Sequence, residues 1–361
     1  MNKVFKQTVV AAVIILTSTV FINCDNTATI KKNEVATLGL VDNLDHSVKE
    51  EITARKPVVF ITGYDKGNET FYNNARAYFK EQQFQIVEDK YSLEEVINWL
   101  NKNEEENPYG EIHIVNKSNP YKGMTLETTI KGEKVTAESL RRNITKGTLP
   151  TLNESVNENS KIIFHANGLG ENTELMNTFK DAFCADELPN VIASPYFSIF
   201  DGEFTKHYLA KPHYVFYPTA NSPGKTDLSK EIAKKYPGEK DIDWFEALNN
   251  EEERFVGEAY TTQFTIPVKF VLDYHNSDEE VPNFENQEEV MDFIEQELYL
   301  EIEKLEIPLE KFRWMYVVKN SKLTITGKTT GLVVLKPLIK PYGELQHIAP
   351  DTNNKRLYAM N

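Results

Sequence analysis

Two predicted strands end in polar side chains, at the place where an open α/β sheet binds its ligands. The strands span residues 111–115 and 161–165, and each is a short apolar run that contains a histidine. Imidazole, ammonium, amide and hydroxyl groups at such a position have the chemistry for acid–base work or for ligand contacts. The residues concerned are His113, Lys117, Ser118, His165, Asn167 and Gly168.

The alternation of side chains along a strand places the two histidines. His113 shares a strand face with Lys117, and His165 shares one with Asn167 if its strand extends that far. If the two strands are neighbours, His165, Asn167 and Lys117 line one cleft. For both histidines we favour a hydrogen-bonded place in the interior over a catalytic or ligand-binding role.

Other catalytic and ligand-binding motifs are absent from the sequence. Gly168 and Gly170 follow a strand, but no GxxxxGK[ST] phosphate loop and no third glycine accompany them. There is also no GxSxG nucleophile elbow, no HExxH pair and no EF-hand loop. Acidic runs at residues 104–106, 251–253 and 278–280 are typical of solvated turns or helix ends. We therefore expect neither a cofactor nor a bound metal.

The elements that must position these residues alternate between strand and helix. Ser92 and Glu95 have the spacing of a capping box at a helix start, and residues 123–135 are typical of a hairpin after the third strand. The alternation predicts an α/β fold, with a mostly parallel sheet flanked by helices, and a further strand at residues 214–217 to close it. The strands are predicted at residues 57–63, 85–87, 111–115, 161–165 and 190–194, and the helices at 73–84, 92–103, 137–145 and 174–183.

The pattern changes beyond about residue 220, where we predict an α+β region. Pro267 lies within one of its strands and favours an edge position or a bulge there. Apolar residues three or four apart predict one long amphipathic helix over residues 287–305. The remaining elements are a helix at 227–236 and strands at 264–272, 313–318, 323–326 and 332–338.

The order of elements over residues 57–200, with the two strand ends, resembles the caspase-like (clan CD) cysteine peptidases, in particular their CHAT-type branch. In that family a His-Gly pair ends the third strand and an Ala-Cys pair ends the fourth, and the thiolate attacks a peptide carbonyl with the histidine as its acid–base partner. Here Lys117-Ser118 stands where His-Gly is expected, and Ala166-Asn167 stands where Ala-Cys is expected. Both catalytic positions are therefore substituted.

The two substitutions remove the chemistry of the family. An amide such as that of Asn167 is not a nucleophile, and an ordinary lysine such as Lys117 is protonated at neutral pH and cannot act as a base. The resemblance implies a peptidase-like fold without its catalytic dyad. We predict a pseudoenzyme that acts in binding or scaffolding, with a candidate pocket at Lys117, Ser118, His165, Asn167 and Gly168.

Two alternatives remain open at this point. One is a hydrolase that uses a rebuilt site in the same cleft, with His165 and Lys117 as its groups. The other is a surface lipoprotein that binds glycan or peptide through its C-terminal region. Aromatic side chains there supply the contact area, although we favour a core role for them: Trp244, Phe245, Trp314, Tyr316 and Tyr342.

Charge narrows the range of partners. The 361-residue chain has 40 basic and 55 acidic residues, a net charge of -15. Such a surface repels phosphate backbones, so we expect no nucleic-acid partner. We expect a membrane partner through a lipid anchor, and a peptide or protein ligand.

The lipid anchor is predicted from the first residues of the chain. Lys3 and Lys6 precede an apolar run at residues 9–16, and Cys24 follows a second apolar stretch. This resembles a bacterial lipoprotein signal, although Asn23 departs from the small residue expected before the cysteine. We therefore predict a signal peptide over residues 1–23, a tether over 24–55, the caspase-like domain over 56–218 and the α+β region over 219–361. The expected location is the cell envelope, on the outer membrane or facing the periplasm.

If Cys24 is the lipidated residue, label from radioactive palmitate will travel with the full chain and vanish in a Cys24→Ala variant. The matched control is Cys184→Ala, because Cys184 is predicted to be a small buried hydrophobe and not a modified thiol. Label that persists in Cys24→Ala, or a mature N-terminus elsewhere, would contradict the prediction.

Overall fold

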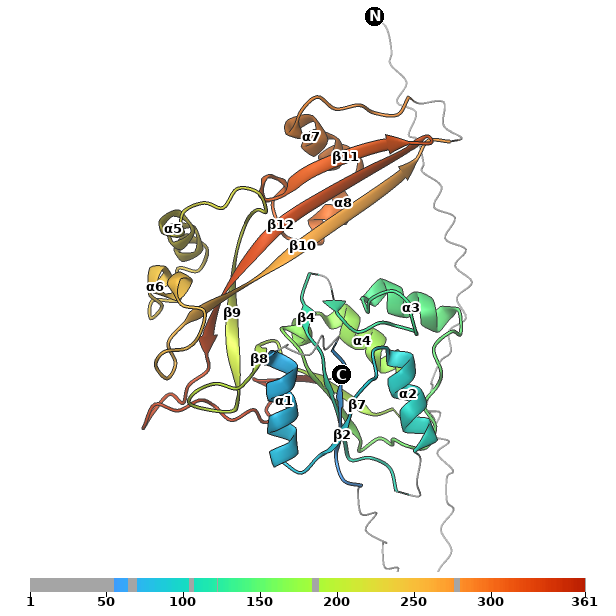
Figure 1. Ribbon diagram of the computed structural model, residues 1–361, viewed down its shortest axis with the longest axis vertical. Helices are drawn as coiled ribbons and strands as arrows, with labels where there is room; N and C mark the ends of the chain where they lie inside the picture. Colours follow the sequence, from blue (N-terminus) through green and yellow to red (C-terminus); the bar gives the residue numbers. More distant parts are fainter. Residues whose placement is uncertain are drawn as a thin grey trace, which may run out of the picture. The chain divides into compact units, whose positions relative to one another are not determined.

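The computed structural model of the protein contains two principal β-sheets (Figure 1). The structure describes residues 55–63, 70–103, 107–121, 123–183, 188–275 and 280–360. The predicted signal peptide, Cys24 and Cys184 lie outside these residues, as does most of the predicted tether. No helix in the described part is long and apolar enough to cross a membrane.

The first sheet is mostly parallel, as predicted. Its strand order is β13-β7-β6-β3-β1-β2, and only β13 runs antiparallel to its neighbour. The order 2-1-3-4-5 of its parallel strands is that of a doubly wound sheet. The strands are β1 (Val58–Ile61), β2 (Gln85–Val87), β3 (Glu111–Val115), β6 (Lys161–His165), β7 (Asn190–Ala193) and β13 (Ala359–Met360).

Helices connect the parallel strands where the sequence predicts them. The capping box of α2 is confirmed, since Ser92 Oγ accepts from Glu95 N at 3.2 Å and Glu95 Oε2 accepts from Ser92 N at 3.0 Å. The helices are α1 (Thr70–Glu81), α2 (Leu93–Lys102), α3 (Ala137–Thr145), η1 (Leu169–Glu171) and α4 (Thr173–Ala182).

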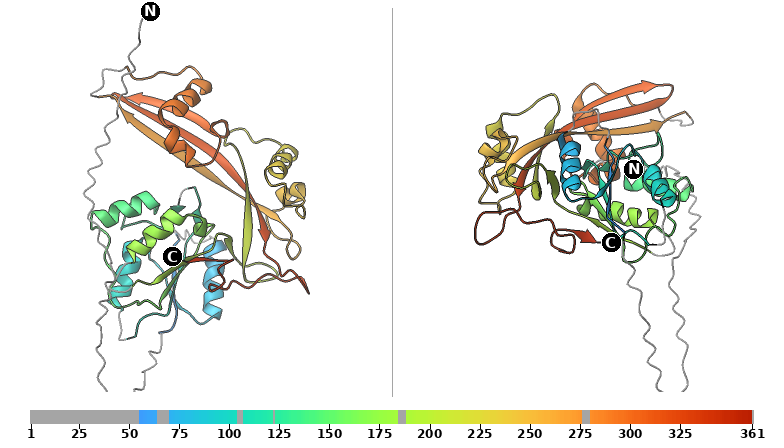
Figure 2. Two further views of the ribbon diagram at one scale, coloured as in Figure 1. Left: turned by 180° about the vertical axis from the view of Figure 1, so that it is seen from behind. Right: turned by 60° about the horizontal axis from the view of Figure 1, so that its bottom comes forward.

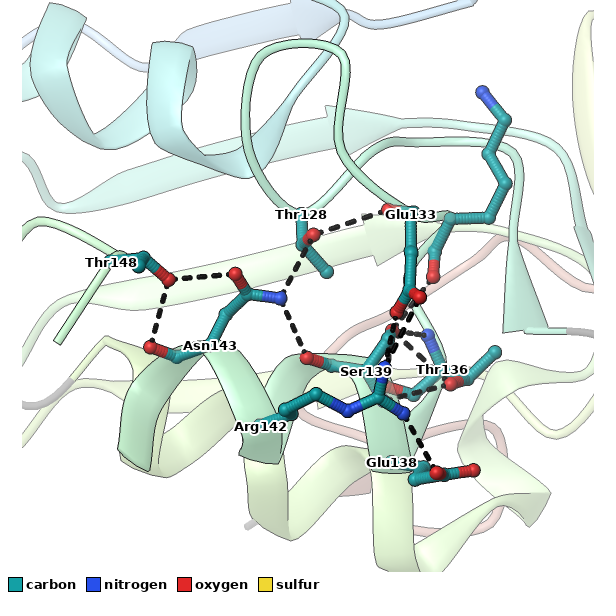
Figure 3. Close-up of polar contacts among 9 residues, drawn as sticks. Thr128, Glu133, Thr136, Glu138, Ser139, Arg142, Asn143 and Thr148 are labelled. Carbon is teal, nitrogen blue, oxygen red and sulfur yellow. Dashed lines mark hydrogen bonds and ion pairs between the residues drawn. The ribbon is translucent and has the colours of Figure 1, made fainter. Parts of the chain in front are cut away.

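The segment after β3 folds back on itself and is held against α3. The short strands β4 (Ser118–Asn119) and β5 (Gly123–Met124) pair antiparallel, so the hairpin begins earlier than predicted. Asn143 Nδ2 donates to Thr128 Oγ1 at 3.2 Å. Figure 3 shows this bond, and it shows Arg142 between the carboxylates of Glu133 and Glu138. These contacts fix the segment that leaves the end of β3.

The two faces of the parallel sheet have different covers. Alternate residues such as Phe60 and Phe164 pack in one core with α2, α3 and α4. The opposite residues, such as Val59 and Val115, pack with α1 and with Phe200. Both faces are therefore buried, as expected for a parallel sheet.

The second sheet is antiparallel. Its order is β10-β12-β9-β8, and β11 also pairs with β12. The strand predicted at residues 214–217 is present, but the prediction that it closes the parallel sheet is wrong, because it lies within β9. The strands are β8 (Phe197–Phe200), β9 (His207–Pro218), β10 (Tyr260–Asp273), β11 (Arg313–Lys319) and β12 (Lys322–Pro337).

Helices pack on both faces of the antiparallel sheet. The helices α5 (Lys225–Lys235) and α6 (Trp244–Asn249) share a core with outward-facing residues of β9 and β12. The elements α7 (Gln287–Glu297), α8 (Tyr299–Glu303) and η2 (Leu309–Lys311) lie against the other face. The left panel of Figure 2 shows α7 and α8 in front of the strands of the antiparallel sheet.

The single helix predicted over residues 287–305 is interrupted at Leu298, which leaves the helical conformation with φ -126° and ψ 21°.

Strands predicted separately at residues 323–326 and 332–338 are one strand, β12. Two glycines lie between the predicted stretches, and aromatic rings fill the space of the missing side chains. A Cβ on Gly327 would overlap the ring of Trp314, and one on Gly331 would meet Phe216 and Phe264. The strand is continuous because its neighbours supply the packing that the glycines lack.

The chain returns from the second sheet to the first. After β12, Leu357 and Tyr358 are buried against Ile163 and Ile192, and Ser194 Oγ donates to Leu357 O at 2.8 Å. The boundary predicted at residues 218/219 falls at the end of β9, whose partner β12 follows it in sequence. This domain division stays a prediction.

The C-terminal return is expected to stabilise the first sheet. Leu357→Ala will lower the free energy of unfolding by about 2–4 kcal/mol, because it leaves a cavity against the sheet. Met360→Ala, in the same segment but exposed, will lower it by less than about 1 kcal/mol. Urea unfolding of both variants measures the difference, and equal effects would show that Leu357 does not hold the segment.

Candidate functional site

The ends of β3 and β6 meet, as the candidate site requires. The two strands pair in parallel with Val115 opposite His165. Beyond them, Ser118 Oγ donates to Asn167 O at 2.9 Å and accepts from Asn167 N at 2.6 Å. Ser118 and Asn167 therefore form a two-bond clamp between the strand ends.

A buried amide that the sequence analysis did not single out supports this clamp. Asn116 Nδ2 donates to Thr62 Oγ1 at 3.0 Å, and Asn116 Oδ1 accepts from the backbone of Thr125 and Leu126 at 3.0 and 3.1 Å. Asn116 thus ties the ends of β1 and β3 to the segment after β5. Its place directly after a buried strand was the available signal, since a polar group there must find partners.

Lys117 and Gly168 complete the strand ends. The backbone N–H of Lys117 donates to the hydroxyl of Tyr72 at 3.0 Å, and its Nζ lies 5.9 Å from the centre of the Phe71 ring. Gly168 has φ +70°, a left-handed conformation that suits glycine, and its N–H donates to Tyr196 O. The structure therefore brings Lys117, Ser118, Asn167 and Gly168 to one edge of the sheet.

His165 points into the core and not toward the clamp. His113 Nδ1 and His165 Nε2 form a hydrogen bond of 2.8 Å, and the ring of His165 also contacts His207 and Phe79. Both histidines are buried. Both histidines therefore have the interior, hydrogen-bonded role that we favoured. The predicted cleft of His165, Lys117 and Asn167 is not formed, because the ring of His165 lies in the core.

These imidazoles form a buried cluster with His207, which comes from the antiparallel sheet. Burial lowers the pKa of His113, against the opposing effect of the Glu111 carboxylate 3.5 Å away. Burial and repulsion from His113 and His207 hold the pKa of His165 well below its ordinary value. Burial lowers the pKa of His207 to about 3. All three rings are therefore neutral at neutral pH.

A second buried pair also escaped the sequence analysis. Glu253 Oε1 lies 2.8 Å from His347 Nε2, and Tyr208 stacks on His347 with ring centres 4.1 Å apart. The acidic run at residues 251–253 is typical of solvated turns or helix ends, but its last residue, Glu253, is buried. The pair ties the loop before β10 to the segment after β12, and no local sequence pattern links positions so far apart.

The aromatic residues of the C-terminal region are mainly core residues, as favoured. Trp244 and Trp314 are buried, and the half-buried Tyr316 donates through its hydroxyl to Phe284 O. Phe245 and Tyr342 are exposed.

A surface cavity of about 500 Å³ lies in the antiparallel region and not at the strand ends. The cavity is lined by Pro218, Ala220, Asn221, Gln287, Met291, Glu310, Phe312 and Arg313.

Among the described residues, no group of three or more His, Cys, Asp or Glu side chains has the arrangement of a metal site.

Comparison with known proteins identifies no relative. No protein-family model, no curated protein and no solved structure matches the chain.

The buried histidines predict a loss of stability in acid. A histidine whose folded-state pKa is depressed has no effect on stability above its unfolded-state pKa of about 6.5. Below that pH the unfolded chain binds a proton that the folded protein does not, so the free energy of unfolding falls until the pH reaches the folded-state pKa. Between pH 7 and 5.5, the free energy of unfolding of His207→Phe will fall by about 1 kcal/mol less than that of the wild type. The other charged groups near the cluster are Glu111 and Lys161, and both the wild type and His207→Phe retain them.

Urea unfolding at the two pH values measures this difference. His275→Phe is the control, because His275 is exposed and its replacement leaves the buried cluster intact. An unchanged pH dependence in His207→Phe would mean that the cluster does not govern acid stability.

Proposed function

We propose that the chain is an envelope-anchored, caspase-like pseudoenzyme that acts in binding or scaffolding. The observation that carries this proposal is the clamp between Ser118 and Asn167. In the caspase-like resemblance, Ser118 stands at the glycine that follows the expected histidine position, Lys117, and Asn167 stands at the position of the nucleophilic cysteine. The Ser118 hydroxyl, bonded to both the carbonyl and the N–H of Asn167, holds the two loops together there and supplies no covalent chemistry.

The topology is compatible with the resemblance. The third and fourth parallel strands are neighbours, as the caspase-like order requires, and a polar segment follows the third strand. The same 2-1-3-4-5 order also occurs in other doubly wound sheets. The family assignment therefore rests on the strand-end residues together with the order.

The environment of His165 argues against the alternative of a rebuilt hydrolase. Its Nε2 atom is paired with His113 and its ring is buried among aromatic side chains. A general base must reach the proton that it removes from a substrate. His165 has no such access in this structure, so we favour binding over hydrolysis.

Membrane attachment through Cys24 remains part of the proposal. It would hold the folded region at the envelope by a lipid chain and the predicted tether. A single acyl chain gives only reversible membrane binding, whereas the several chains of a lipoprotein anchor give stable attachment. A scaffold with this attachment presents its surfaces to partners near the membrane.

Restoring the two catalytic groups tests the assignment of the strand ends. The Lys117→His/Asn167→Cys double variant is expected to have a thiol with a lowered pKa, alkylated at pH 6 about tenfold faster than a free cysteine. A thiol at the exposed position Ser222→Cys supplies the matched control. The wild-type protein is expected to cleave no fluorogenic peptide substrates.

Two results would count against the proposal. Wild-type peptidase activity that disappears in His165→Ala would favour the rebuilt hydrolase. A thiol in the double variant that reacts no faster than that of Ser222→Cys would remove the caspase-like assignment of these loops.

A further inference from the structure

The outer face of the antiparallel sheet is covered over only half its length. Near β9, the outward residues Leu332 and Val334 of β12 pack with α5 and α6. Toward the other end of β12, no helix of the described residues packs on the outward face of β10, β11 and β12. Figure 1 shows these three strands from the side opposite α8.

The uncovered face is a regular grid fixed by the strand register. In the first row, Arg313 of β11 lies opposite Lys328 of β12, which lies opposite Pro267 of β10. The other three rows are formed in the same way by every second residue along each strand. In β12 the grid residues alternate with buried ones, such as Leu323 and Ile325. We call this grid the open basic face; it consists of Arg313, Lys328, Pro267, Met315, Thr326, Lys269, Val317, Thr324, Val271, Lys319, Lys322 and Asp273.

The charge of this face is opposite to that of the whole chain. The grid has five basic side chains and one acidic one, whereas the chain has 40 basic and 55 acidic residues. Only Lys322 has an ion-pair partner among the described residues, Asp273 at 3.1 Å. Arg313 and Lys328 lie directly opposite each other, although like charges in a cross-strand pair are destabilising. Folding does not explain this arrangement, which an anionic partner would stabilise.

Apolar side chains in the middle of the face add a contact area. Val271 is 55% exposed, Met315 49% and Val317 61%. Val271 and Val317 flank Thr324 in one row, so this strip has an apolar side chain on β10 and on β11, with a polar one on β12 between them. A partner that matches the strip must combine carboxylates with apolar side chains.

The size and shape of the face select among anionic partners. Its twelve residues are about half of the 20–30 that each side of a stable protein–protein interface contributes. That extent is small for a dimer interface and suits a short segment. Short, stiff side chains such as Val271 and Val317 cannot reach the 5–10 Å depth of an interfacial membrane anchor. The net charge of the chain also opposes an anionic bilayer.

We propose that the open basic face binds an acidic, partly apolar segment of a partner protein. This inference rests on the binding role proposed above and specifies the chemistry of the partner. Carboxylates of the segment would pair with Lys269, Arg313 and Lys328, and its apolar side chains would cover Val271 and Val317. Such binding is weakened by salt, because exposed charges are screened.

Fluorescence polarisation with a short labelled peptide, in which Glu or Asp alternates with Val or Leu, tests the inference on the full chain in a non-ionic detergent. We expect binding at about 50 mM NaCl that weakens strongly at about 300 mM. Lys269→Glu/Lys328→Glu is expected to weaken binding by about tenfold or more. Lys269→Gln/Lys328→Gln, which only removes the charges, is expected to weaken it less.

The matched control reverses two exposed lysines elsewhere, Lys146→Glu/Lys234→Glu, with the same change of net charge. The same peptide with Gln in place of each acidic residue is expected not to bind. The inference would be overturned if the acidic peptide fails to bind. It would also be overturned if the peptide binds Lys269→Glu/Lys328→Glu and the control Lys146→Glu/Lys234→Glu equally well.

Two further outcomes would also overturn it. Anionic phospholipid vesicles that bind through Lys269 and Lys328 while the peptide does not would make the face a membrane surface. Self-association that the charge reversal abolishes would make the partner a second copy of the chain. The pseudoenzyme proposal fails separately, through peptidase activity, so the two failures are distinguishable.

Discussion

A parallel sheet must be buried on both faces, and this constraint governs how the chain is arranged. Three helices cover one face, but α1 covers only part of the other. Phe200 and the C-terminal residues Leu357 and Tyr358 cover the rest, and all of them come from the antiparallel sheet or follow it in sequence. The core of the first sheet therefore includes residues that belong to the second, which explains why the chain returns to add β13 after completing β12.

The same burial explains the chemistry of the strand ends. Polar groups at a buried edge must be paired, and here they are paired with one another. Asn116 joins β1, β3 and the segment after β5, while Ser118 and Asn167 join β3 to β6. The histidines are likewise enclosed, and their neutrality at neutral pH makes this core sensitive to acid. The Ser118 hydroxyl and the buried histidines thus contribute to the cohesion of the fold.

The antiparallel sheet differs because its second face is only half covered. The part next to β9 packs with α5 and α6, whereas the part next to the β11–β12 turn exposes basic and apolar side chains. An antiparallel sheet tolerates one solvated face, so the fold does not require a partner there. The unmatched charges on a strongly acidic chain are what set this face apart.

Sequence patterns alone determined the parallel strands, their helices and the capping box of α2, because these depend on apolar periodicity and local hydrogen bonds. They also located Lys117, Ser118, Asn167 and Gly168 at one sheet edge, and they favoured an interior role for His113 and His165. Only the tertiary structure decided that β9 belongs to the antiparallel sheet, since its apolar residues suit either sheet. It likewise decided that β12 continues past its glycines, where Trp314 and Phe264 fill the gaps, and that Glu253 is buried with His347. These features depend on contacts between residues far apart in the chain, which no local pattern encodes.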